Sequence, residues 1–179
     1  MFTGSYMHLA WGAGFTLLLA LGCVWDLRTR KIPNELVATI LVTGFLFALS
    51  SPNIVPALGR ALAGVAVGFG IWIPFYLVGA IGAGDVKFFA AAGSWLGPAA
   101  SWRAALAAAV FGGIIALIYL LLEKRLGAVL RRIALAASSR TLMVVQEGAG
   151  ATGTRHRPLP YGVALALGAS VVAWFPGLS

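Results

Sequence analysis

Cysteine, histidine and charged side chains are scarce in this sequence of 179 residues. The single cysteine, Cys23, excludes a disulfide scaffold and a CxxC zinc-binding pair. The two histidines, His8 and His156, form no HExxH motif, and Ser94 lies in no GxSxG nucleophile elbow. Charged residues make up 10% of the chain, against about 25% in an average globular domain. An ordinary soluble domain is therefore excluded, and we expect neither a metal site nor a cofactor.

Apolar residues are instead abundant, at 60% of the chain with a mean hydropathy of +0.94. A domain this short has no core large enough to hide so much apolar surface from water. Lipid is therefore the expected solvent, and apolar runs of about 20 residues mark helices that cross it. We predict an all-α integral membrane bundle of about six transmembrane helices, forming one domain over residues 1–179. The expected spans are 7–25, 35–49, 57–79, 88–96, 104–122 and 161–175.

Basic residues outnumber acidic ones by 13 to 5, which gives a net charge of +8. In a membrane protein this excess is a topology signal, so we expect no nucleic-acid partner. With the N-terminus outside, every Lys and Arg except Arg60 and Arg103 falls on the inside of the membrane or at its edge. The predicted topology therefore has both termini outside and three cytoplasmic loops. The last of these loops, near 123–158, predicts a basic amphipathic helix on an anionic inner leaflet, followed by a glycine-rich linker.

The two aspartates, Asp26 and Asp85, both lie where a predicted span meets an inside loop. Taken singly, Asp85 fits a helix N-cap, and Asp26 fits an edge charge paired with Arg28 or Arg30. The predicted topology, however, brings both aspartates to the same face of the membrane, which these two separate interpretations explain less well. Two carboxyl groups that share a proton can activate water and cleave an amide without a covalent intermediate. We therefore predict that the two carboxyl groups meet at a hydrated pocket near the cytoplasm.

Glycines precede the second aspartate, at Gly82 and Gly84. Glycine allows the backbone to leave helical geometry, and the helix expected at 88–96 is only about 14 Å long. The hydrocarbon core is roughly 30 Å thick, so a helix this short cannot cross it alone. We expect the 82–87 segment to be unwound and recessed below the membrane surface.

Three stretches resemble the prepilin peptidases, the membrane aspartyl proteases with a GxGD motif: 26–34 (DLRTRKIPN), 82–87 (GAGDVK) and 159–166 (LPYGVALA). The resemblance implies that Asp26 and Asp85 are the catalytic pair. It also implies that the enzyme removes leader peptides from type IV pilin or pseudopilin precursors, at the cytoplasmic face of the bacterial inner membrane. Larger family members carry an N-terminal insert with paired cysteines and also N-methylate the product. Because Cys23 is alone, the chain resembles the short, peptidase-only branch that serves tight-adherence (Flp-type) pili, and we expect no N-methyltransferase activity.

Roles for the site residues follow from charge and position. Asp85 begins a helix, where the dipole favours an anion, and Asp26 ends one, where the dipole disfavours it. We therefore predict Asp85 as the base and Asp26 as the acid, although the nearby arginines oppose this assignment by favouring the ionised form of Asp26. Gly82, Gly84 and Lys87 are expected to shape the pocket, although Lys87 also fits an interface anchor. Glu35 is a candidate contact for a basic leader residue, and its alternative is compensation of a helix dipole.

Two functions of other classes stay open from the sequence. A proton-coupled transporter also places carboxylates in a polar pocket, but it is expected to show repeated halves and acids nearer the bilayer centre. A non-catalytic membrane subunit of a pilus or secretion assembly would have no use for a pair of aspartates. Asparagine substitution of either aspartate separates these functions from a protease.

Overall fold

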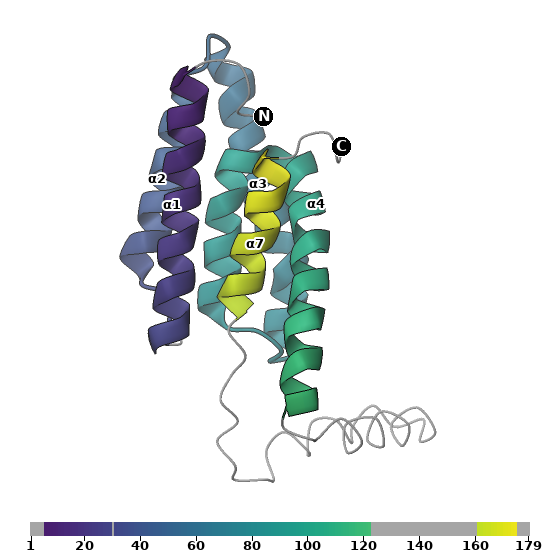
Figure 1. Ribbon diagram of the computed structural model, residues 1–179. Coiled ribbons are helices and arrows are strands. Elements are labelled where there is room, and N and C mark those ends of the chain that lie inside the picture. The colour runs from purple at the N-terminus through teal and green to yellow at the C-terminus, as the bar shows by residue number, and fades with distance from the viewer. Residues whose placement is uncertain (1–5, 30, 123–160, 175–179) are drawn as a thin grey trace. The chain divides into compact units, whose positions relative to one another are not determined.

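The computed structural model describes residues 6–29, 31–122 and 161–174, and all of the regular structure in these ranges is helical. The predicted basic helix within 123–158 lies outside the described residues. The chain divides into two compact units, Met1–Gly112 with Pro160–Ser179, and Gly113–Leu159. Every contact discussed below lies within the first unit. The helices, shown in Figure 1, are α1 (Tyr6–Thr29), α2 (Asn34–Leu49), α3 (Ile54–Leu77), α4 (Ala83–Leu122) and α7 (Tyr161–Trp174).

The helix α4 consists of two arms, 83–96 and 98–122, because the chain reverses at Gly97. Gly97 has a φ of 74°, a left-handed conformation that glycine adopts without steric cost, and Pro98 follows it. Ser101 Oγ lies 3.2 Å from the Cβ position of Gly93, eight residues earlier. In a straight helix those positions would be about 12 Å apart. The two arms correspond to the separate helices predicted at 88–96 and 104–122.

Leu9–Thr29 and Ile54–Leu77 are long and apolar enough to cross a membrane, and the apolar stretch Ala83–Ile118 is divided by the turn at Gly97 into the two arms of α4. The helices α2 and α7 are apolar but shorter. Large apolar side chains remain exposed on several helices, among them Leu17 at 62% and Leu62 at 60%. Exposed apolar surface on this scale suits lipid better than water. An all-helical membrane protein is therefore supported, whereas six spans with both termini outside stay a prediction.

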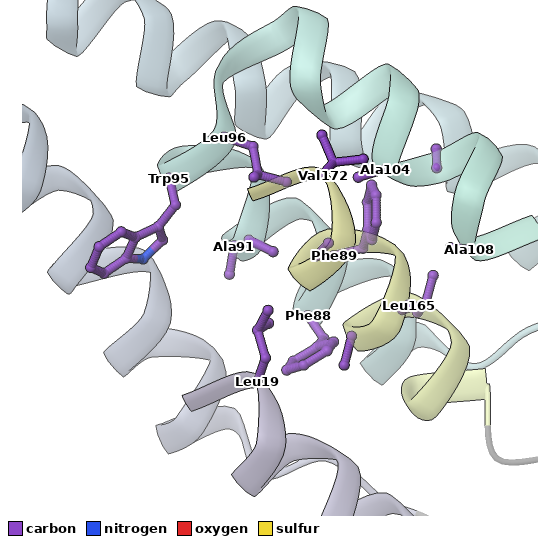
Figure 2. Packing of buried hydrophobic residues seen from close by; sticks show 14 of the residues in the cluster. Leu19, Phe88, Phe89, Ala91, Trp95, Leu96, Ala104, Ala108, Leu165 and Val172 are labelled. Carbon is purple, nitrogen blue, oxygen red and sulfur yellow. The ribbon is translucent and has the colours of Figure 1, made fainter. Parts of the chain in front are cut away.

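The core joins α1, both arms of α4 and α7 (Figure 2). Phe88 and Phe89 are fully buried, and Leu165 of α7 is almost so. Burial of an aromatic or leucine side chain stabilises a fold by about 1.5–3 kcal/mol where water is the alternative. The end of α7 is attached to α1 by a hydrogen bond of 2.8 Å, in which Trp174 Nε1 donates to Thr16 Oγ1. This packing fixes α7 beside α1.

The first arm of α4 crosses α3 at two glycines. A Cβ on Gly64 would collide with the carbonyl oxygen of Gly93, and a Cβ on Gly93 would collide with that of Gly64. The two glycines therefore have a packing role at this crossing. Backbones approach this closely only where neither residue has a side chain.

Alanine at Gly64 or Gly93 is expected to lower the free energy of unfolding by about 3 kcal/mol, because two backbones must move apart. Thermal unfolding in detergent measures this loss. Gly70 on the same helix α3 has no heavy atom within 4 Å of its Cβ position, so Gly70→Ala is the matched control. Equal melting temperatures for Gly64→Ala and Gly70→Ala would contradict the tight crossing.

Candidate active site

One cavity of about 350 Å³ brings together the two aspartates. Asp26 comes from the last turns of α1 and Asp85 from the first turn of α4. We call this space the dyad cavity. Its lining residues are Asp26, Lys31, Ile32, Asn34, Gly82, Gly84, Asp85 and Lys87. Five residues besides Asp26 were singled out from the sequence. The cavity is lined by four of them, Gly82, Gly84, Asp85 and Lys87, and not by Glu35.

Asp85 is held by the start of its own helix. The carbonyl oxygen of Gly82 accepts the N–H groups of Asp85 at 3.2 Å and Val86 at 3.3 Å, so Gly82 is the N-cap. Asp85 Oδ2 in turn accepts the N–H of Gly82 at 3.3 Å. A side chain at the third helical position that reaches back to the N-cap amide is half of a capping box. Asp85 is therefore not the N-cap, as the sequence suggested, but the third residue of the helix, and Gly82 is the N-cap.

This capping also corrects the expectation of an unwound 82–87 segment. The helix begins at Ala83, so only Gly82 precedes it, and neither Gly82 nor Gly84 has a positive φ. A hydrogen-bonded first turn satisfies the backbone amide that an unwound segment would leave open. A Cβ on Gly84 would lie 3.8 Å from Ile32 in the cavity wall, which is an ordinary van der Waals contact, so Gly84 borders the cavity without a steric need for glycine.

Asp26 lies in the last turns of α1 and is only 6% exposed. Its Oδ2 accepts the N–H of Gly162, at the start of α7, over 3.0 Å. A Cβ on Gly162 would stand 2.8 Å from that oxygen, which is too close for a real contact. Glycine at this position thus lets α7 deliver a backbone amide to the carboxylate. Arg30, one of the two arginines considered as its partner, lies outside the described residues.

The contact to Gly162 changes the electrostatic comparison of the two aspartates. A helix N-terminus favours a negative charge. Asp85 stands at the N-terminus of α4, and Asp26 faces the N-terminus of α7 although it belongs to the end of α1. Helix dipoles therefore do not distinguish the base from the acid. The dipole argument for Asp85 as the base, which the sequence suggested, no longer separates the two aspartates.

The sequence missed three lining residues and the part played by Gly162. Lys31, Ile32 and Asn34 come from the α1–α2 connection and the first residue of α2. Pro33 holds this connection extended, with φ −61° and ψ 139°, before α2 begins. All four residues belong to the stretches that carry the family resemblance, so the signal was present, but only the tertiary contacts reveal what these positions touch.

Two lysines, Lys31 and Lys87, place positive charge around the two carboxylates of the dyad cavity. Such charge offsets the repulsion between carboxylates that share a site. In the described part of the chain, no three of histidine, cysteine, aspartate and glutamate gather as a metal-binding group. The expectation of a site without metal stays a prediction. The arrangement suits proton transfer between two carboxyl groups, water and a bound amide.

Residues 13–117 match the type IV leader peptidase family, and this range includes both aspartates. A prepilin leader peptidase/N-methyltransferase of Pectobacterium carotovorum subsp. carotovorum is 36% identical over 125 residues, covering 64% of this chain and 43% of that protein. Its counterpart in Legionella pneumophila is 32% identical over 131 residues, covering 64% and 45%. A type 4 prepilin-like proteins leader peptide-processing enzyme of Escherichia coli is 37% identical over 112 residues, covering 57% and 39%. The chain thus spans less than half the length of these relatives, and no solved structure matches it.

Proposed function

The chain belongs to the type IV leader peptidase family, and we propose that it is a membrane aspartyl endopeptidase that removes leader peptides from type IV pilin-like precursors. One observation carries the proposal: Asp26 and Asp85, distant in sequence, line a single cavity with room for water and a peptide segment. The names of the relatives support the choice of substrate, since they are leader peptidases of prepilins.

The mechanism follows from two carboxyl groups that hold one proton between them. The ionised aspartate takes a proton from a water molecule while the oxygen of that water attacks the scissile carbonyl carbon. The protonated aspartate donates its proton to the carbonyl oxygen. Breakdown of the tetrahedral intermediate then releases the leader carboxylate and the new amino terminus. We propose Asp85 as the base and Asp26 as the acid, with both aspartates facing a helix N-terminus.

The other lining residues suit the binding of a peptide. The carboxamide of Asn34 has both donors and an acceptor for a peptide backbone. Lys31 and Lys87 offset the charge of the dyad, which is the pocket-shaping role that we propose for Lys87. Glu35 is exposed and follows Asn34 directly, so a leader lysine or arginine that approaches the cavity passes near it. We retain Glu35 as a candidate leader contact.

The proposed setting is the bacterial inner membrane, with the dyad cavity facing the cytoplasm. The apolar helices support a membrane location, and the distribution of lysine and arginine supports this orientation. In this setting the apolar segment of a precursor lies in the bilayer and its basic leader lies at the anionic inner leaflet. We further propose that the chain belongs to the peptidase-only branch that serves Flp-type pili, because its single cysteine, Cys23, makes its sequence resemble that branch.

Co-expression of the chain with candidate pilin precursors tests the proposal. We expect conversion of the precursor to a product shorter by its leader, with an unmethylated amino terminus by mass spectrometry. The conversion must depend on both aspartates. A precursor that keeps its full mass with every candidate tried would instead favour a non-catalytic subunit, and a methylated product would contradict the peptidase-only assignment.

A further inference from the structure

A second cavity, of about 520 Å³, lies at the other end of the helices from the dyad cavity. It is formed where α2 ends, α3 begins and the first arm of α4 turns, together with the N-terminal half of α1. Its size falls in the range of ligand pockets, about 300–1,000 Å³. We call it the Arg60 cavity, after a lining set that includes Trp11, Phe47, Ser51, Asn53, Arg60 and Trp95.

One wall of the Arg60 cavity is aromatic and preorganised. The Trp95 ring stacks on Phe47 at a centroid distance of 5.3 Å and meets Trp11 at 5.8 Å. Trp95 is only 2% exposed, and its Nε1 donates to the carbonyl oxygen of Ile40 over 2.9 Å. Trp95 thus supports the wall from behind, whereas Trp11 and Phe47 are only partly buried and present ring surface to the cavity. This wall suits a hydrocarbon chain.

The opposite side of the Arg60 cavity is polar and positively charged. Arg60 is the charged residue of the lining, and no carboxylate stands among the described residues that form it. Asn53 precedes α3, and its side chain makes no capping hydrogen bond to the first turn of that helix. The start of α3 therefore adds a positive dipole end and backbone donors to the guanidinium of Arg60.

The turn at Gly97 brings the backbone of α4 close to this arginine. Arg60 Nε lies 3.8 Å from the Cβ position of Gly97. Arg60 is exposed, so its guanidinium is open to an anion that enters the cavity. The described carboxylates, Asp26, Glu35 and Asp85, belong to the opposite helix ends, so an anion that pairs with Arg60 would come from outside the described residues.

We propose that the Arg60 cavity binds an anionic phospholipid, with the phosphate against Arg60 and the start of α3 and an acyl chain along the aromatic wall. The cation and the apolar wall together match a molecule with an anionic head and a hydrocarbon tail. A bilayer around the apolar helices supplies such a molecule at high local concentration. The proposal is independent of leader cleavage, because the dyad cavity shares no lining residue with the Arg60 cavity.

Native mass spectrometry of the purified chain in detergent tests this site, with phosphatidylglycerol and phosphatidylcholine of identical acyl chains as probes. We expect selective retention of phosphatidylglycerol, and a loss of about tenfold in its affinity with Arg60→Gln, since charge-assisted hydrogen bonds are lost. Arg60→Lys should keep most of the binding. Arg103→Gln is the matched control, because Arg103 lies on the second arm of α4, close to the turn at Gly97, and does not line the cavity.

Three results would overturn the proposal. They are equal retention of both lipids, unchanged retention with Arg60→Gln, and displacement of phosphatidylglycerol by inorganic phosphate that binds with the same dependence on Arg60. Melting temperatures without lipid show whether a variant is folded. Should Arg60→Gln not fold, Ala57→Leu narrows the cavity from its own lining and is expected to weaken phosphatidylglycerol in the same way.

Discussion

Replacing Asp26 or Asp85 with asparagine is expected to lower precursor cleavage by roughly a thousandfold or more, below detection in a membrane assay. Asparagine keeps the size of aspartate and still accepts a hydrogen bond, so the amides of Gly162 and Gly82 retain a partner. It cannot accept a proton from water or donate one as a carboxylic acid. The variants therefore remove the proton chemistry while they preserve the local contacts. The time course of leader removal, followed by gel mobility, measures the effect.

Cys23→Ser is the matched control for these substitutions. Cys23, the single cysteine of the sequence, lies one turn before Asp26, and its Sγ is 3.9 Å from the carbonyl oxygen of Gly162. If the carboxyl groups carry the reaction, the serine variant keeps its activity. Loss of activity with Cys23→Ser and retention with either asparagine variant would point to a thiol nucleophile. Melting temperatures exclude loss of folding as the cause.

Substitution of Gly162 by valine is expected to lower cleavage by about a hundredfold or more, although this residue has no chemistry of its own. A Cβ at this position would stand 2.8 Å from Asp26 Oδ2 and 3.1 Å from Asp26 Cβ. The carboxylate must rotate away or α7 must move, and either change breaks the hydrogen bond from the Gly162 amide. Gly162→Ala should show the same defect to a smaller degree. Cleavage rates at saturating precursor concentration measure the loss.

Gly70→Ala is the control for Gly162 as well, since it adds the same methyl group to a helix where nothing lies within 4 Å. A positioning role predicts that Gly162→Ala loses cleavage rate at saturation while keeping most of its thermal stability. A purely structural role predicts parallel loss of both. Wild-type cleavage by Gly162→Ala and Gly162→Val would show that Asp26 does not need this contact.

Much of the fold was predictable because its signal is local. Apolar runs place the helices within a few residues of their bounds in the structure, since lipid-facing and core-facing positions are both apolar. The reversal at Gly97 was predictable for a similar reason, because a Gly-Pro pair interrupts a helix whatever surrounds it. The side of the membrane on which the termini lie depends on loop charges and stays a prediction.

The candidate site was predictable only in part. The two aspartates were identified from their scarcity and from the motifs around them. From the sequence, however, Asp26 was judged by the dipole at the end of its own helix, and the contact with the Gly162 amide could not be foreseen. The capping of Asp85 reversed the expectation of an unwound segment, because one hydrogen bond from Gly82 makes the helical turn favourable. Hydrogen bonds and close approaches of this kind depend on angstrom-scale distances that periodicity does not encode.

An apolar helical chain with two aspartates in recognisable motifs can be read from composition and spacing, since both are local properties. The folded arrangement was needed to show that α7 brings the amide of Gly162 to Asp26, that Lys31 and Asn34 border the same cavity, and that Arg60 lines a second cavity together with aromatic side chains. The physical reason is that these contacts join residues far apart in the chain. Their distances are set by how closely helices pack, and here glycines at the crossings set that closeness.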